Sequence, residues 1–160
     1  MYRNKSAYKP FSNSLYNKYD EPARAFVKKI YNDLGIIAQD NPDKYGIDLI
    51  LYKDDNKIGY AEVECCASWN MPIYPYKSLH VPIRKEKFFK LDMPSEYWQV
   101  SNTFSRALHI DGEQILKSPV IVVPNKYVLS NERFYDVELN IMSSYNRGLM
   151  ISREDLPLAF

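Results

Sequence analysis

The sequence predicts a single α/β domain of the α+β arrangement, and three observations support this class. Apolar residues recur at helical spacing between residues 20 and 35, two apolar runs flank a polar turn at 54–56, and Pro and Gly separate strand-like segments after residue 94. The 160 residues are enough for one domain with a real core. We therefore expect one domain over residues 20–160, preceded by a basic arm with aromatic residues over 1–19.

The first predicted element is a helix that follows Asp20. Asp20 is a favourable N-cap residue, Pro22 suits the first turn, and Gly35 suits the end of the helix. The apolar residues that recur at helical spacing between these positions are Ala23, Phe26, Val27, Ile30 and Leu34. This pattern predicts one apolar face that packs on a core.

Strands follow the helix. Residues 45–65 predict a β-hairpin around the polar turn, residues 78–84 a third strand, and residues 85–91 a short helix. Further strands are expected at 96–104, 106–110, 119–125 and 133–141. The predicted order is therefore a helix, three strands, a short helix, and extra strands toward the C-terminus.

The sequence also predicts a cytoplasmic protein that does not enter a membrane. No apolar run approaches the roughly 20 residues that span a bilayer, and the first residues, MYRNKSAYKPFSNSLY, lack the apolar core of a signal peptide. The cysteines, Cys65 and Cys66, are neighbours, a geometry that rarely closes a disulfide and that suits a reducing compartment. The net charge of +1 leaves nucleic acid open as a partner, because a local basic patch decides such binding.

Acidic residues interrupt the predicted hairpin. Glu62 and Glu64 share one face of its second strand, since side chains alternate along a strand. Asp48 stands in the apolar run GIDLILY, where a lone acid is costly unless it is solvated, paired or bound to a metal. Glu62 and Glu64 alone could face water on a half-solvated strand, but Asp48 shifts the balance toward a cation site. Clustered oxygen ligands favour a hard ion such as Mg²⁺.

The segments GID at 46–48 and EVE at 62–64 resemble the motif of the PD-(D/E)xK nuclease superfamily, over about residues 20–100 of this chain. The core of that family is the restriction-endonuclease-like fold: a helix, three strands, a helix and a further strand around a mixed sheet. The resemblance implies a mixed central sheet flanked by helices, with the C-terminal strands from about residue 97 as an extension.

The resemblance also assigns metal ligands. It implies that Asp48 and Glu62 bind Mg²⁺, for which Mn²⁺ can substitute, and that Val63 adds its backbone carbonyl. Glu21, at the start of the first helix, is the candidate for the acid that the family often carries there. A glutamate near a helix N-terminus is also favoured by the helix dipole alone.

One position departs from the family pattern. The motif lysine is replaced by Glu64, so the cation that orients water or stabilises charge on the phosphate has to come from elsewhere. Lys85, in the segment HVPIRKEKF, is our choice, with Arg84 or Lys87 as substitutes, although a solvated basic turn explains this segment equally well. Without such a lysine, Glu64 is a third metal ligand or a base.

The resemblance implies a Mg²⁺-dependent endodeoxyribonuclease that hydrolyses phosphodiester bonds in duplex or branched DNA. Restriction, repair, junction-processing and virus-encoded (phage-like) roles stay open, as do cleavage of RNA and assembly as a homodimer. The expected contacts to the DNA backbone are Arg84, Lys87, Lys90 and Lys28. Two alternatives remain: a catalytically inactive module of the same fold that binds DNA or a protein partner, and an unrelated α/β interaction protein whose acids lie on its surface.

Overall fold

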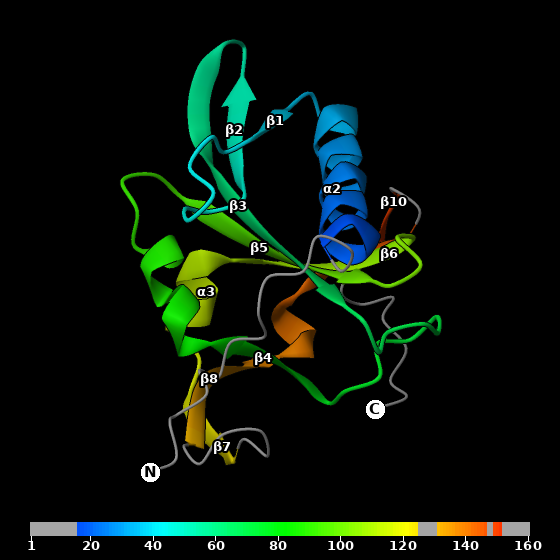
Figure 1. Ribbon diagram of the computed structural model, residues 1–160, viewed down its shortest axis with the longest axis vertical. Helices are drawn as coiled ribbons and strands as arrows, with labels where there is room; N and C mark the ends of the chain where they lie inside the picture. Colours follow the sequence, from blue (N-terminus) through cyan, green and yellow to red (C-terminus); the bar gives the residue numbers. More distant parts are fainter. Residues whose placement is uncertain (1–15, 125–130, 147–148, 152–160) are drawn as a thin grey trace.

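The computed structural model describes residues 16–124, 131–146 and 149–151. The predicted N-terminal arm lies outside the described residues except for its last positions, which form a short π-helical turn, η1 (Tyr16–Asp20). Figure 1 shows one long helix and two sheets. No helix of the described part is long and apolar enough to cross a membrane.

The larger sheet is mixed, as expected. Its strands, in spatial order, are β1 (Ile37–Asp40), β2 (Leu49–Lys53), β3 (Asn56–Cys66), β5 (Ser95–Ser101), β6 (Arg106–Asp111), β9 (Ser143–Asn146) and β10 (Leu149–Ile151). β3 and β5 are parallel, and every other neighbouring pair is antiparallel. The smaller sheet is antiparallel and contains β4 (Ser78–Pro82), β8 (Asn131–Glu138) and β7 (Val120–Pro124).

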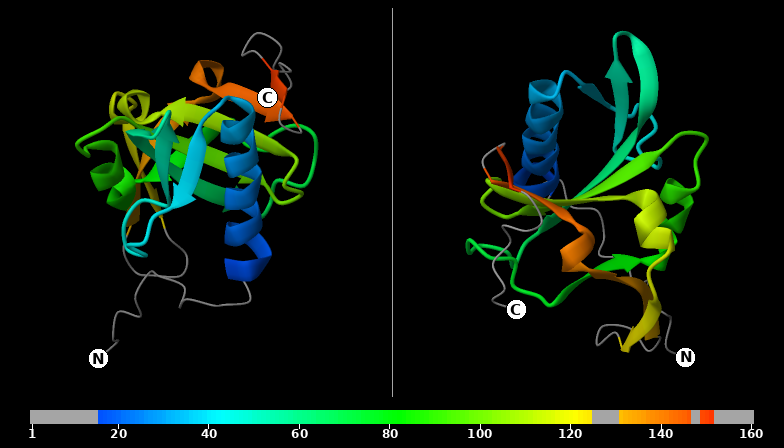
Figure 2. Two further views of the ribbon diagram at one scale, coloured as in Figure 1. Left: turned by 90° about the horizontal axis from the view of Figure 1, so that it is seen from above. Right: turned by 180° about the vertical axis from the view of Figure 1, so that it is seen from behind.

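The helix α2 (Glu21–Asp33) forms where its apolar spacing predicts it. It buries Ala23, Val27, Ile30 and Tyr31 against one face of the larger sheet (Figure 2). The chain leaves the helix through Gly35, whose φ of +77° lies in the left-handed region that favours glycine. Asp20 precedes the helix, but its side chain makes no capping hydrogen bond.

The predicted hairpin is confirmed. β2 and β3 pair antiparallel on either side of a tight turn. Asp54 and Asp55 have φ values of 50° and 63°, the left-handed conformation that a two-residue hairpin turn requires. The hairpin positions the residues of the site described below.

A second core fills the space between the other face of the larger sheet and the smaller sheet. It is formed by buried residues that include Trp69, Tyr97, Leu108, Val81 and Val137. The short helices η2 (Ile83–Phe89), α3 (Gly112–Leu116) and η3 (Leu139–Ile141) border this core. A long helix therefore covers one face of the sheet, and the smaller sheet with short helices covers the other.

The third predicted strand does not join the hairpin. Residues 78–82 form β4, which pairs with β8 in the smaller sheet. The strand that joins the hairpin on the side of β2 is instead β1, which the sequence pattern did not reveal because three of its four residues are exposed. The short helix predicted at 85–91 is present as η2, a 3₁₀ helix that begins at Ile83.

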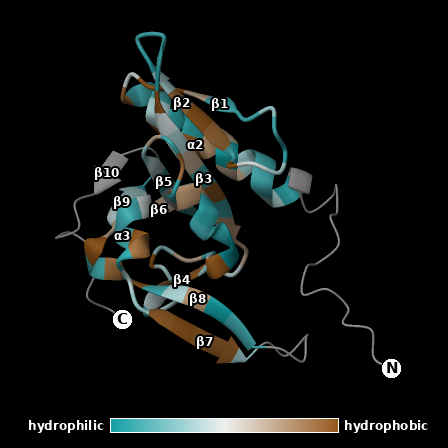
Figure 3. Cartoon of the chain, turned by 90° about the vertical axis from the view of Figure 1, so that its left-hand side faces the viewer, coloured by the Kyte–Doolittle hydropathy of each residue, from teal (hydrophilic) through white to brown (hydrophobic). Residues whose placement is uncertain are grey.

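One of the two edge strands of the smaller sheet is β7. Figure 3 shows this strand as hydrophobic along almost its whole length, and Val120 and Val122 are 42% and 55% exposed. Pro119 precedes the strand and Pro124 ends it. Prolines at such positions limit pairing with a further strand, because they lack the N–H that a ladder needs.

Gly59 is predicted to be sensitive to substitution. A Cβ at this position would lie 2.5 Å from the carbonyl oxygen of Pro94, which already accepts a hydrogen bond from the Tyr60 N–H at 2.9 Å. We expect Gly59→Ala to lower the free energy of unfolding by about 1–3 kcal/mol in urea denaturation. Lys53→Ala, at an exposed position of β2, should change it by less than about 0.5 kcal/mol. Equal effects of the two substitutions would contradict the close approach.

Candidate functional site

The site is built on the central strand β3. Ala61 and Val63 enter the core beneath α2, so Glu62 and Glu64 point to the opposite face of the sheet. Glu62 is buried, with 6% of its surface exposed, whereas the side chain of Glu64 is 37% exposed. A buried carboxylate is stable only with hydrogen bonds or an opposite charge nearby. The partners of Glu62 therefore define the site.

Asp48 is the first partner of Glu62. The sequence pattern placed Asp48 within the strand, but it lies one residue before β2. Oδ2 of Asp48 accepts a hydrogen bond from the Val63 N–H at 2.9 Å, and the Asp48 N–H donates to Oε2 of Glu62 at 3.2 Å. These two bonds fix the two carboxyl groups beside each other.

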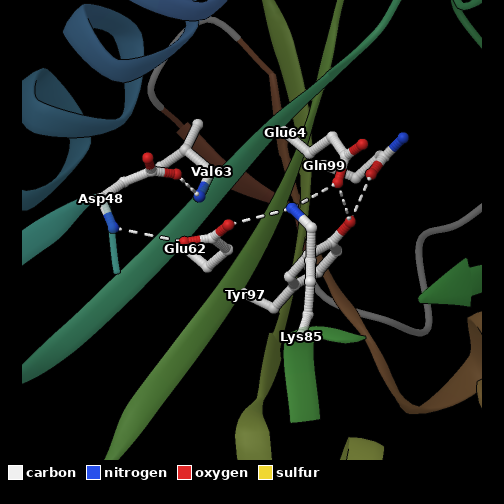
Figure 4. Close-up of polar contacts among 7 residues, drawn as sticks. All are labelled: Asp48, Glu62, Val63, Glu64, Lys85, Tyr97 and Gln99. Atoms are coloured by element: carbon white, nitrogen blue, oxygen red, sulfur yellow. Dashed lines mark hydrogen bonds and ion pairs between the residues drawn. The ribbon is translucent and has the colours of Figure 1, made fainter. Parts of the chain in front are cut away.

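Lys85 is the second partner. It comes from η2, after the chain has crossed to the smaller sheet. Its Nζ lies 2.9 Å from Oε1 of Glu62 and 2.8 Å from Oε2 of Glu64, and only 12% of the side chain is exposed (Figure 4). The sequence analysis chose Lys85 as the replacement for the missing motif lysine, and the structure places it beside both glutamates. Its catalytic role stays a prediction.

Tyr97 and Gln99 complete the polar cluster, and sequence reasoning missed both. The parallel register of β3 and β5 places Tyr97 beside Glu62, and Gln99 beside Glu64. The Tyr97 hydroxyl lies 3.1 Å from Oε2 of Glu64 and 3.0 Å from Oε1 of Gln99 (Figure 4). The alternation in EYWQV put these two residues on one face, but nothing in the sequence showed that β5 pairs with β3.

Asp20, at the end of η1, is an acid near the cluster that sequence reasoning did not assign to the site. Partial burial raises the pKa of Asp20, and the nearby charges of Asp48 and Glu64 raise it further. Glu21 is exposed, and within the described residues no hydrogen bond or ion pair joins it to the site. The role of Glu21 as a metal ligand stays a prediction.

The two glutamates differ in proton affinity. Burial raises the pKa of Glu62 to about 7, although the Lys85 ammonium opposes this shift. Burial also acts on Glu64, but there the charge and hydrogen bond of Lys85 outweigh it and hold the pKa below the ordinary value. Burial raises the pKa of Asp48 against the hydrogen bond from Val63. The cluster therefore contains one firmly ionised acid, Glu64, and one acid, Glu62, that titrates near neutral pH.

The shift at Glu62 predicts a pH dependence of stability. Glu62 binds its proton more tightly in the folded chain than in the unfolded chain. Its protonation therefore adds to the free energy of unfolding in full below pH 4.5, and this stabilisation is lost as the pH rises through about 7. Relative to Glu62→Gln, the wild-type chain should lose on the order of 3 kcal/mol of unfolding free energy between pH 4.5 and pH 8. Urea denaturation in metal-free buffer measures both curves, and parallel curves would refute the shift.

The predicted DNA contacts lie on two elements. Arg84, Lys87 and Lys90 are exposed on η2 and just after it, close to Lys85 in the chain. Lys90 forms an ion pair with Glu86. Lys28 lies on α2, away from η2 in sequence, and its Nζ is 3.0 Å from a carboxylate oxygen of Asp40. Their contact with DNA stays a prediction.

The donor atoms fit a hard divalent cation. Asp48 and Glu62 offer carboxylate oxygens, the ligands that Mg²⁺ prefers. Oδ1 of Asp48 has no hydrogen-bond or ion-pair partner among the described residues. Asp48 also lines a cavity of about 600 Å³ between α2 and the loop before β2, which Lys44 and Tyr45 border as well. Ligands can therefore reach Asp48 from outside.

Comparison with known proteins adds no assignment. The chain matches no model of a known protein family and no curated protein sequence.

Proposed function

We propose that the chain is a divalent-metal-dependent nuclease that hydrolyses phosphodiester bonds in DNA. The observation that carries this proposal is the convergence of Asp48, Glu62 and Lys85. They come from three separate elements, and the Lys85 ammonium lies 2.9 Å from Glu62 while the Asp48 N–H donates to the same glutamate. In metal-assisted phosphate hydrolysis, acidic side chains hold the metal ion and a nearby cation stabilises the charge that develops on the phosphate.

The topology around the site supports the resemblance to the PD-(D/E)xK superfamily. A helix, α2, precedes three antiparallel strands, β1, β2 and β3, and the chain then crosses over to β5, which is parallel to β3. This order agrees with the restriction-endonuclease-like core that the resemblance implies. The crossover differs from that pattern, because it carries β4 and the 3₁₀ helix η2 in place of a regular helix.

Asp48, Glu62 and the backbone carbonyl of Val63 are the groups proposed to hold Mg²⁺ or Mn²⁺. Such an ion, when bound, neutralises charge on the scissile phosphate and lowers the pKa of a coordinated water. The hydrogen bond from the Val63 N–H keeps the Asp48 carboxylate oriented before any ion arrives. Orientation in advance matters because a misplaced ligand costs affinity.

Lys85 is proposed to take the role of the motif lysine that Glu64 replaces. Burial lowers the pKa of Lys85, but Glu64 and Glu62 outweigh burial and raise the pKa above its ordinary value. The side chain is therefore a permanent cation and a hydrogen-bond donor, not a base. Its role is to stabilise negative charge as it develops on the phosphate. Glu64, which accepts a hydrogen bond from the Tyr97 hydroxyl, holds the ammonium beside Glu62.

The exposed cations on η2 support the proposal of a nucleic-acid substrate. Arg84 and Lys87 lie on the same short helix as Lys85. A phosphate backbone that reaches the acids of the site can therefore also contact these two side chains. Such contacts position a nucleic acid without reading its sequence. We assign DNA as the substrate from the family resemblance, in duplex or branched form, and a homodimer would let two sites act on two strands.

One observation favours the second candidate function, an inactive module that binds DNA or a protein partner. Lys85 already has two carboxylate partners, so the charges of this trio are partly balanced without a metal. A chain that had lost catalysis could keep such a network for its stability alone. Cleavage separates this candidate from the nuclease.

The test incubates the purified chain with supercoiled, linear, single-stranded and branched DNA, and with RNA, in Mg²⁺ or Mn²⁺. Cleavage of at least one DNA form that stops with chelator and returns with added metal is the expected result. A gel-shift assay in Ca²⁺ shows which form binds. Binding without cleavage in either metal would replace the nuclease by the inactive module, and neither binding nor cleavage would refute both the nuclease and a module that binds DNA.

A further inference from the structure

A second cluster of metal-ligating side chains lies on the α2 side of the larger sheet. Glu96 of β5 stands directly opposite Asp111 of β6, and His109 stands opposite Trp98. Because alternate residues share a face, Glu96, His109 and Asp111 all project to the same side. One ligand atom from each of the three lies within 4.8 Å of those of the other two. This face is separate from the one that carries Glu62 and Lys85.

Neighbouring side chains hold two of the three ligands in place. Oε1 of Glu96 accepts a hydrogen bond from the Tyr31 hydroxyl at 3.0 Å, and that hydroxyl accepts one from the Trp98 indole N–H at 2.8 Å. Oε2 of Glu96 is hydrogen-bonded to Nε2 of His109. The His109 ring packs on Trp98 with 4.5 Å between ring centroids, and on Tyr145. Outer contacts of this kind orient metal ligands and raise affinity.

The cluster is open to solvent on one side. Asp111 is exposed, and the side chains of His109 and Glu96 are 16% and 26% exposed. His109 and Asp111 also line a cavity of about 230 Å³ that extends to Gln114 and Ser143. An ion can therefore enter, and water can fill the coordination positions that the three side chains leave open.

We propose that Glu96, His109 and Asp111 bind a divalent transition-metal ion of the Zn²⁺ class. One imidazole nitrogen and two carboxylate oxygens suit Zn²⁺, Co²⁺ and Ni²⁺ better than Mg²⁺, which prefers oxygen alone. Three protein ligands with an open position are typical of sites that keep a water. The proposal does not depend on the nuclease function, because it uses none of the residues assigned to that site.

Trp98 provides the readout. The chain has two tryptophans, and Trp69→Phe leaves Trp98, in the core beneath α2, as the single reporter. Co²⁺ quenches indole fluorescence at short range, so Co²⁺ added to the untagged Trp69→Phe chain should give saturable quenching with one ion per chain. Zn²⁺, which does not quench, should reverse it by competition.

Two ligand variants and three matched controls decide the question. Asp111→Asn removes an exposed ligand without disturbing the core, and we expect it to weaken Co²⁺ binding at least about 10-fold. His109→Gln should abolish quenching. Glu113→Gln and His80→Gln should leave it unchanged, and in Asp48→Asn, which weakens the other proposed metal site, saturable quenching should persist. No saturable quenching in the parent chain, or equal quenching in Asp111→Asn and Glu113→Gln, would overturn the proposal.

Discussion

Lys85→Met is expected to lower the free energy of unfolding by about 3–5 kcal/mol at pH 8, measured by urea denaturation. The ammonium lies 2.9 Å from Glu62 and 2.8 Å from Glu64, and its side chain is 12% exposed. Its removal leaves the buried Glu62 without an opposite charge beside the acidic Asp48. An uncompensated buried charge costs far more than the ion pair itself contributes.

Lys87→Met is the matched control. Lys87 lies two residues further along η2 and is exposed, so its loss should change stability by less than about 0.5 kcal/mol. Adding Glu62→Gln to Lys85→Met should recover part of the lost stability, since it removes the uncompensated charge. Similar effects of Lys85→Met and Lys87→Met would show that the Lys85 ion pairs do not stabilise the folded chain.

Asp48→Asn is expected to slow metal-dependent DNA cleavage by about 10³-fold or more. Metal-assisted hydrolysis owes several kcal/mol to the ion, and each 1.36 kcal/mol is a factor of ten in rate. Asparagine keeps the shape of the side chain and an oxygen that can accept the Val63 hydrogen bond, but it removes the negative charge. Initial rates of plasmid nicking at saturating Mg²⁺ provide the measurement.

Asp33→Asn is the control for this variant, because Asp33 is an exposed acid at the end of α2. It should cleave at the wild-type rate. Circular dichroism and the thermal midpoint establish that both variants fold. If folded Asp48→Asn cut DNA as fast as Asp33→Asn, Asp48 would have no part in catalysis.

Much of the fold follows from local patterns. The apolar spacing before Gly35 located α2, and the polar turn at 54–56 located the hairpin, because both elements carry their signal within a few residues. The partner of each strand was harder to predict. Residues 78–84 read as a third strand, yet β4 belongs to the smaller sheet, and β1 is too short and exposed to give a pattern. Pairing depends on contacts between distant segments.

The site residues likewise fall into those that a local pattern identified and those that depend on contacts between distant segments. Asp48 and Glu62 stood out because acids in apolar runs are costly, and Lys85 because the motif position lacked its cation. Tyr97 could not be found, since its place beside the glutamates follows from the parallel pairing of β5 with β3. The position of Asp20 near the cluster also had no local signal, because it depends on how the chain enters α2.

We propose that Lys85 supplies the cation that the nuclease motif places at the position of Glu64. The most direct test compares plasmid cleavage in Mg²⁺ by the wild-type chain, Lys85→Met, and the double variant Glu64→Lys with Lys85→Met. The double variant restores Glu-x-Lys over residues 62–64 and again pairs Glu62 with a cation. We predict that Lys85→Met loses at least about 100-fold in rate and that the double variant recovers most of this loss. No cleavage by the wild-type chain, or a folded double variant as inactive as Lys85→Met, would contradict the account.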